Sequence, residues 1–177
     1  MLFSCIFATY TSISAHPLFF YKHKNKHKKM TPQQIFETMY AKDYFSQWLG
    51  VHLLHIAAGR CSLSMLVRKD MLNGFGVLHG GVSFALADSA FAFASNSHRR
   101  ISVSIETSIS HTVAVFEGDT LTATAEEQYL NHKLAIYYVT ITNQHQQIVA
   151  LFKGTVYRKT QEHTPLDETP PLPIKPH

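Results

Sequence analysis

One segment constrains the fold more than any other, residues 79–98, "HGGVSFALADSAFAFASNSH". Its length and alanine content favour a helix over a strand. A helix that is apolar almost all round must be buried on most of its sides. Between His79 and His98 the only ionisable residue is Asp88. Burying a lone carboxylate costs on the order of several kcal/mol unless it is paired or neutralised, so Asp88 needs an explanation.

The pattern before this segment predicts one helix and a hairpin. Residues 33–48 place apolar side chains along one face of a predicted helix, and Gly50 is its stop signal. Residues 51–58 and 61–70 are two strand candidates joined around Gly59, and the second alternates apolar and polar residues. The stripe of the first helix consists of Ile35, Phe36, Met39, Tyr40 and Tyr44.

The pattern after the segment predicts four strands. Residues 101–109 alternate, with Ile101, Val103, Ile105 and Ile109 expected on one face. Residues 121–125 alternate as well, and residues 134–141 and 147–157 are apolar on both faces. An α+β fold follows, in which one antiparallel sheet wraps a single buried helix.

The ends of the chain differ from this central part. Residues 1–29 hold five lysines and no acid, which leaves 11 basic against 12 acidic residues in the rest, so nothing indicates nucleic-acid binding. The leader is apolar first and basic second, the reverse of a secretory signal, and polar residues interrupt it, which argues against a membrane span. We expect a leader over 1–29, with Met30 as an alternative start, a domain over 30–159 and an extended proline-rich tail over 160–177. The isolated Cys5 and Cys61 favour a reducing, cytoplasmic location.

Two features of the long helix are candidate chemistry. Gly80 and Gly81 stand at its start, where free N–H groups can polarise a carbonyl, although a glycine pair can also simply open a helix. Helical spacing groups Asp88 with Gly81 and with the candidate substrate-binding residues Phe84 and Phe91. In a cavity Asp88 would be a base or a nucleophile. The alternative is an Asp that pairs with an arginine or caps a loop.

The loop before the helix holds two weaker candidates. Asn73 is by default the turn residue of an Asn-Gly pair, and its amide could instead orient water or a carbonyl. His79 is either a base or a positioning group that donates to backbone. The other histidines are scattered, so no metal site is expected.

These residues together carry a resemblance. The pattern "LNG(x3)LHGG(x3)ALADSAFAFASNS", followed by "FEGDTLTATA" and "IVALFKG", resembles the hot-dog-fold thioesterases of the phenylacetic-acid-degradation type from Gln33 to Arg158. The resemblance implies that one sheet wraps one long helix, that two subunits pair their sheets, that dimers form tetramers, and that the site lies between subunits. It implies no cofactor beyond the coenzyme A of the substrate.

The resemblance also implies roles for particular residues. Asp88 would be the general base or nucleophile, the Gly80 N–H would polarise the thioester carbonyl, and Asn73 would help to hold that carbonyl or water. His79 would shape the loop, and Ser104 would place a hydroxyl near the attacking water. Residues 110–115, "SHTVAV", depart from the aromatic-Leu-Arg-Pro turn of many relatives, so no contact from that arginine is expected.

The function expected is hydrolysis of an aryl-acetyl or medium-chain acyl-CoA. Four basic residues are candidate partners of the coenzyme A phosphates, although ordinary solvated charge is the more common explanation for any single one, and the phosphate site stays unassigned: Arg99, Arg100, Lys133 and Arg158. The alternatives are a hot-dog hydratase or dehydratase, which needs a differently placed His and acid, and a non-catalytic acyl-CoA sensor.

Overall fold

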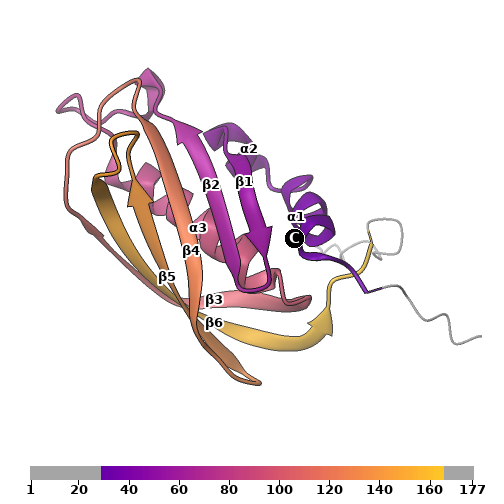
Figure 1. Ribbon diagram of the computed structural model, residues 1–177. Coiled ribbons are helices and arrows are strands. Elements are labelled where there is room, and N and C mark those ends of the chain that lie inside the picture. Colours follow the sequence, from indigo (N-terminus) through magenta and orange to yellow (C-terminus); the bar gives the residue numbers. More distant parts are fainter. Residues whose placement is uncertain (1–28, 166–177) are drawn as a thin grey trace, which may run out of the picture.

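A curved antiparallel sheet wrapped around one long helix forms the body of the protein (Figure 1). The computed structural model describes residues 29–165. The six strands are ordered β1-β2-β4-β5-β6-β3 across the sheet, and the long helix is α3, Gly80–Asn96. This is the predicted α+β arrangement. The strands are β1 His52–Ala57, β2 Arg60–Leu66, β3 Arg100–His111, β4 Thr120–Leu130, β5 Leu134–Thr142 and β6 Ile148–Glu162, and a short 3-10 helix, η1, spans Lys69–Met71.

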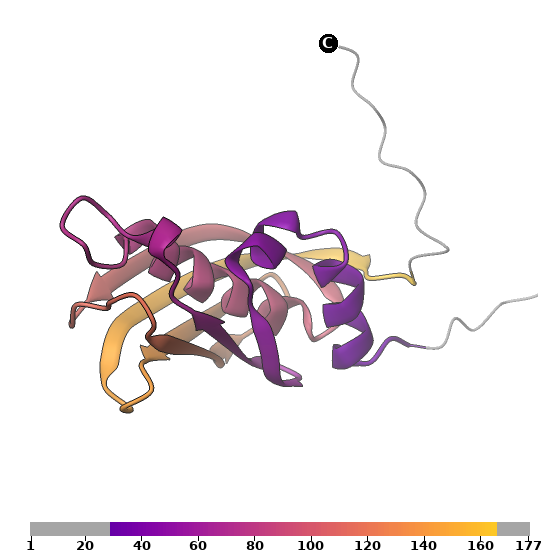
Figure 2. The same ribbon diagram turned by 90° about the horizontal axis from the view of Figure 1, so that it is seen from above.

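The core lies between α3 and the inner face of the sheet (Figure 2). Leu86, Ala87, Ala90 and Ala94 of the helix are fully buried. The alternating apolar residues of β2 and β4 face them, which confirms the predicted alternation: Cys61, Leu63, Met65, Leu121, Ala123 and Ala125. Alanine side chains let the helix lie close to the sheet, so the helix cannot be moved without exposing the core.

The single helix predicted over 33–48 is wrong. The chain forms α1, Pro32–Tyr40, and α2, Tyr44–Leu49, because Asp43 starts a new helix as its N-cap. Tyr44 is consequently not on a buried stripe and is 78% exposed. Gly50 does end the second helix, with the left-handed φ of 74° that glycine favours.

The single apolar face predicted for β3 is also wrong. A β-bulge at Ile105 shifts the pairing of β3 with β6. Val103, before the bulge, pairs with the exposed Tyr157, whereas Ile109, after it, pairs with the buried Phe152. The two side chains therefore lie on opposite faces of the sheet. Since β3 is an edge strand, its other edge carries backbone groups with no strand partner in the described part of the chain.

The last strand of the sheet runs past residue 159. β6 continues to Glu162, and the N–H of His163 donates to the carbonyl of Arg99 (2.8 Å), so the sheet extends past Lys159. The proposed leader lies outside the described residues except for Lys29, as does the tail beyond Pro165. No described helix combines the length and the hydropathy that crossing a bilayer requires.

Candidate active site

The first turn of α3 holds one free backbone donor. His79 is the N-cap of the helix, and its Nδ1 accepts the N–H of Gly81 (2.9 Å). The two roles predicted for His79 were a base and a positioning group that donates to backbone. Its Nδ1 accepts from backbone instead, because an N-cap satisfies helix N–H groups. The N–H of Gly80 meets no acceptor among the described residues. Gly80, and not Gly81, therefore offers the N–H that could polarise a carbonyl.

Asn73 shapes the loop that leads into this turn. Its Oδ1 accepts the N–H of Phe75 (2.8 Å) and, less closely, that of Val77 (3.4 Å). This is the turn role that the Asn-Gly pair predicts. The side-chain NH₂ of Asn73 has no acceptor within the described residues, so it remains able to donate to a ligand.

Asp88 opens into a pocket of about 360 Å³ between α2 and α3. Its carboxylate is partly buried and has no hydrogen bond or ion pair anywhere in the described part of the chain, so the arginine-paired and loop-capping alternatives are not what the structure shows. Burial raises the pKa of Asp88 above its ordinary value, and the negative charge of Asp43 raises it further. A carboxylate with these properties suits a general base or a nucleophile.

The predicted substrate-binding residues separate in the structure. Gly81 and Phe84 line the pocket of Asp88. Phe91 does not line it. Its side chain is 1% exposed and lies in the core, where its ring centroid is 5.7 Å from that of Tyr137 and 5.6 Å from that of Phe152. Ser104 is exposed on β3 and lies outside this pocket.

Asp88 and Gly80 of one chain cannot act on the same carbonyl group. They are eight residues apart in α3, on the order of 12 Å along a helix. A base and an oxyanion donor must each lie within about 3 Å of the reacting group or its water. Asp88 and the Gly80 N–H therefore lie at two separate places along α3 of one chain.

The structure adds a pair of residues that the sequence analysis missed. Nε2 of His111, at the end of β3, lies 2.8 Å from Oγ of Ser83, and that Oγ also lies 3.0 Å from the carbonyl of Gly80. Both contacts are satisfied when Ser83 donates to Gly80 and accepts from Nε2–H, which leaves Nδ1 of a neutral His111 as an acceptor. The pair borders a cavity of about 350 Å³ at the start of α3. The spacing of Ser83 from Gly80 was readable as one helical turn, but nothing in the sequence pairs it with His111.

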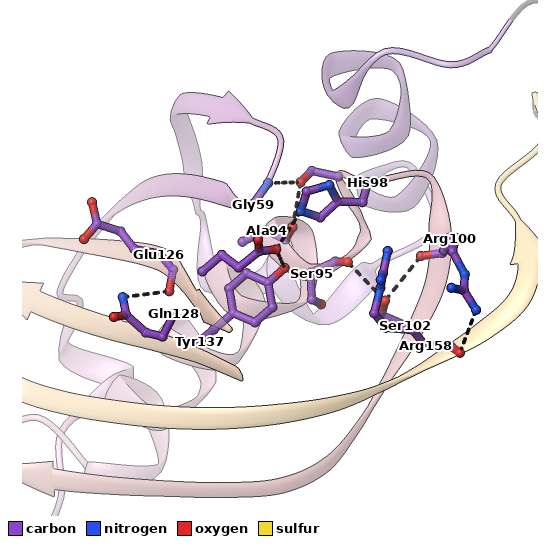
Figure 3. Close-up of polar contacts among 12 residues, drawn as sticks. Gly59, Ala94, Ser95, His98, Arg100, Ser102, Glu126, Gln128, Tyr137 and Arg158 are labelled. Carbon is purple, nitrogen blue, oxygen red and sulfur yellow. Dashed lines mark hydrogen bonds and ion pairs between the residues drawn. The ribbon is translucent and has the colours of Figure 1, made fainter. Parts of the chain in front are cut away.

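A second polar cluster lies at the other end of α3 and is structural (Figure 3). Oε2 of Glu127 lies 2.6 Å from Nε2 of His98 and accepts a hydrogen bond from the hydroxyl of Tyr137 (2.7 Å). Arg100 donates to the carbonyls of Lys159 and His132, both at 2.7 Å. These contacts hold the turns of the sheet to the end of the helix.

Two of the four candidate phosphate ligands belong to this cluster. Arg158 is 9% exposed and donates to the carbonyl of Asn131, while Arg100 uses all of its nitrogens on backbone carbonyls. Both arginines serve the fold. Over residues 29–165 no three His, Cys, Asp or Glu side chains converge as a metal site would require.

Comparison with known proteins places the chain in a family. The model of the Thioesterase superfamily matches residues 75–150. The acyl-coenzyme A thioesterase PaaI of Escherichia coli is 39% identical over 120 residues, which cover 68% of this chain and 86% of that protein. The solved structure of E. coli PaaI superposes with a TM-score of 0.73 and 37% identity, covering 75% and 96% of the two chains.

A more distant structure is that of a Streptococcus mutans protein bound to acetyl-CoA. It has a TM-score of 0.62 and 26% identity, and covers 64% of this chain and 91% of that one. These matches agree with the sheet and the long helix of this chain. The chain therefore belongs to the thioesterase superfamily, as a hot-dog-fold member of the phenylacetic-acid-degradation type.

Proposed function

We propose that the protein hydrolyses acyl-CoA thioesters, with Asp88 as the group that activates water or attacks the carbonyl. The observation that carries this proposal is the unpaired, partly buried carboxylate of Asp88 in a mostly apolar pocket. Its relative PaaI is named as an acyl-CoA thioesterase, and the S. mutans relative binds acetyl-CoA. A hydratase or dehydratase would need a catalytic His with a separate acid in another arrangement, which an Asp on a helix that begins with His-Gly-Gly does not match.

The chemistry follows from two half-sites, Asp88 and the N–H of Gly80. In the water route, Asp88 takes a proton from water as the water oxygen attacks the thioester carbonyl carbon. The carbonyl oxygen gains negative charge and accepts the N–H of Gly80. Collapse of the tetrahedral intermediate breaks the C–S bond, and the proton held by Asp88 passes to the leaving thiolate. In the nucleophile route, Asp88 attacks the carbonyl carbon, expels the thiolate and forms an anhydride, which water then hydrolyses.

The pocket of Asp88 would receive the acyl group. Phe45 and Phe84 supply aromatic walls, and Ala85 and Ala92 leave room between them. A cavity of about 360 Å³ with these walls fits an aryl-acetyl or medium-chain acyl group. The NH₂ of Asn73, in the loop that leads to Gly80, would hold the carbonyl or the water.

A complete site requires two chains. If a two-fold axis sets two α3 helices antiparallel, Asp88 of one chain faces Gly80 of the other, which removes the separation of about 12 Å. The open edge of β3 supplies the pairing surface, since two such edges can join two sheets into one. Exposed apolar side chains on the outer face of the sheet, such as Tyr138 and Leu151, would let two dimers associate as a tetramer.

The test is release of free thiol from a panel of CoA thioesters by the wild type and by Asp88→Asn. We expect hydrolysis by the wild type and a loss of about 10²- to 10⁴-fold in the variant, the usual worth of a positioned base. Glu117→Gln, an exposed acid in the loop before β4, is the matched control and should keep full activity. Equal turnover by wild type and Asp88→Asn would remove Asp88 from its role, and binding without turnover by the wild type would favour a sensor.

A further inference from the structure

A second carboxylate shares the pocket of Asp88. Asp43 precedes α2 and caps it: Oδ1 accepts the N–H of Ser46 (3.0 Å), and Oδ2 accepts the hydroxyl of Ser46 (2.6 Å). Both oxygens of Asp43 are thus held by donors, the arrangement that a carboxylate anion prefers. The negative charge of Asp43 is therefore fixed at the wall of the pocket.

A further hydrogen bond of Ser46 joins α2 to α3 beside Asp88. Oγ of Ser46 lies 2.8 Å from Oγ of Ser89, the residue next to Asp88. Ser46 and Ser89 are 1% and 7% exposed, so this contact is shielded from water. The position of Asp43 relative to Asp88 is consequently set by a buried hydrogen bond and not by a mobile surface loop.

No other acid competes with Asp43 for this role. Among residues 29–165, Asp43 and Asp88 are the only titratable ones that line the pocket. Four other acids on the elements packed against α3 have partners of their own: Glu37 of α1 with Gln33, Glu106 of β3 with Lys153, and Glu126 and Glu127 of β4 with Arg60 and His98. Glu162, at the end of β6, pairs in register with Arg100 and does not line the pocket.

We propose that Asp43 is a positioning residue for the hydrolytic reaction, and that its fixed negative charge, carried into the pocket by α2, makes Asp88 a stronger base. This inference rests on the proposed function. An ordinary aspartate is a weak base near neutral pH, and a like charge close by raises its affinity for a proton. Both oxygens of Asp43 are already occupied by donors, whereas the carboxylate of Asp88 accepts no hydrogen bond from any residue that the structure describes.

The raised pKa of Asp88 agrees with this role for Asp43. Burial is the main cause of its raised pKa, and the negative charge of Asp43 is the second cause within the described part of the chain. Asp43 does not touch the reacting atoms in this scheme, so it acts through Asp88 alone. Removing the charge of Asp43 should lower the pKa of Asp88 without abolishing thioester hydrolysis by Asp88.

Asp43→Asn removes the negative charge of Asp43 and keeps the cap of α2. Asparagine caps helices about as well as aspartate and keeps an acceptor for the N–H of Ser46, so α2 should remain folded. We expect the acid limb of the pH profile of kcat/KM to move to lower pH by on the order of half a unit to one unit. Asp70→Asn removes one negative charge outside the pocket, where Asp70 pairs with Arg68 (3.2 Å), and should leave the limb in place.

A measurement that needs no turnover accompanies the kinetics. Carbon-13 NMR of the Asp88 carboxyl, assigned by its loss in Asp88→Asn, follows the titration directly in wild type and Asp43→Asn. An unchanged Asp88 titration in folded Asp43→Asn would overturn the role of Asp43. A shifted titration with no thioester hydrolysis by the wild type would instead overturn the proposed function and leave the coupling between the two carboxylates standing.

Discussion

The imidazole ring of His111 lies against the first residue of α3, so that a methyl group on Gly80 would sit 3.2 Å from Cε1 of His111. Gly80→Ala should therefore displace the ring or crowd the carbonyl bound at the Gly80 N–H, and we expect kcat/KM to fall by on the order of 10²-fold. Gly74→Ala is the control, because a methyl group there meets nothing within 4 Å. Similar kinetics in both alanine variants would show that close approach to Gly80 is not needed.

Complementation tests the two-chain site. Asp88→Asn and Gly80→Ala should each be nearly inactive, because each damages one half-site. Co-folding equal amounts should restore about a quarter of the wild-type activity, since half of the dimers are mixed and each mixed dimer holds one intact site. Thiol release by the mixture measures this. A site contained within one chain would give no recovery on mixing.

Phe84 and Phe91 should respond differently to the same substitution. Phe84→Leu changes a pocket wall, so we expect altered relative kcat/KM values across an acyl series with a modest change in stability. Phe91→Leu changes the core where the ring packs on Gly154, and it should lower the free energy of unfolding by about 1–2 kcal/mol without changing acyl preference. Urea unfolding and a thioester panel measure the two effects. A shift of acyl preference in Phe91→Leu would return that residue to the substrate site.

The raised pKa of Asp88 also predicts how stability depends on pH. The folded protein holds this proton more tightly than the unfolded chain, so stability falls as pH rises from the ordinary pKa of a carboxyl through the raised value. Asp88→Asn lacks that loss, and its Tm should exceed that of the wild type by a few degrees at pH 7. The difference should shrink on acidification towards pH 4, as measured by thermal unfolding across this range. A gain in Tm that is constant with pH would point to a cause other than ionisation.

Much of the fold could be predicted from local sequence patterns. The alternation of Leu63 and Met65 on β2 and the alanine-rich run of α3 were readable because each follows the period of one element. The break at Asp43 and the bulge at Ile105 were not, since Asp43 sits inside an apolar helical stripe and the bulge follows from how β3 pairs with β6. Periodicity averages over a segment and does not register one inserted or capping residue.

The candidate site divides in the same way. Asp88 could be singled out from residues 79–98 alone: it is the one acid on an apolar helix that starts with Gly80, and burying a lone carboxylate is too costly to be incidental. The packing of the folded chain was needed to place Phe91 in the core, His111 beside Ser83, and Asp43 in the pocket of Asp88. Contacts between residues far apart in the chain depend on how elements pack and pair, and the spacing within any one element does not contain that information.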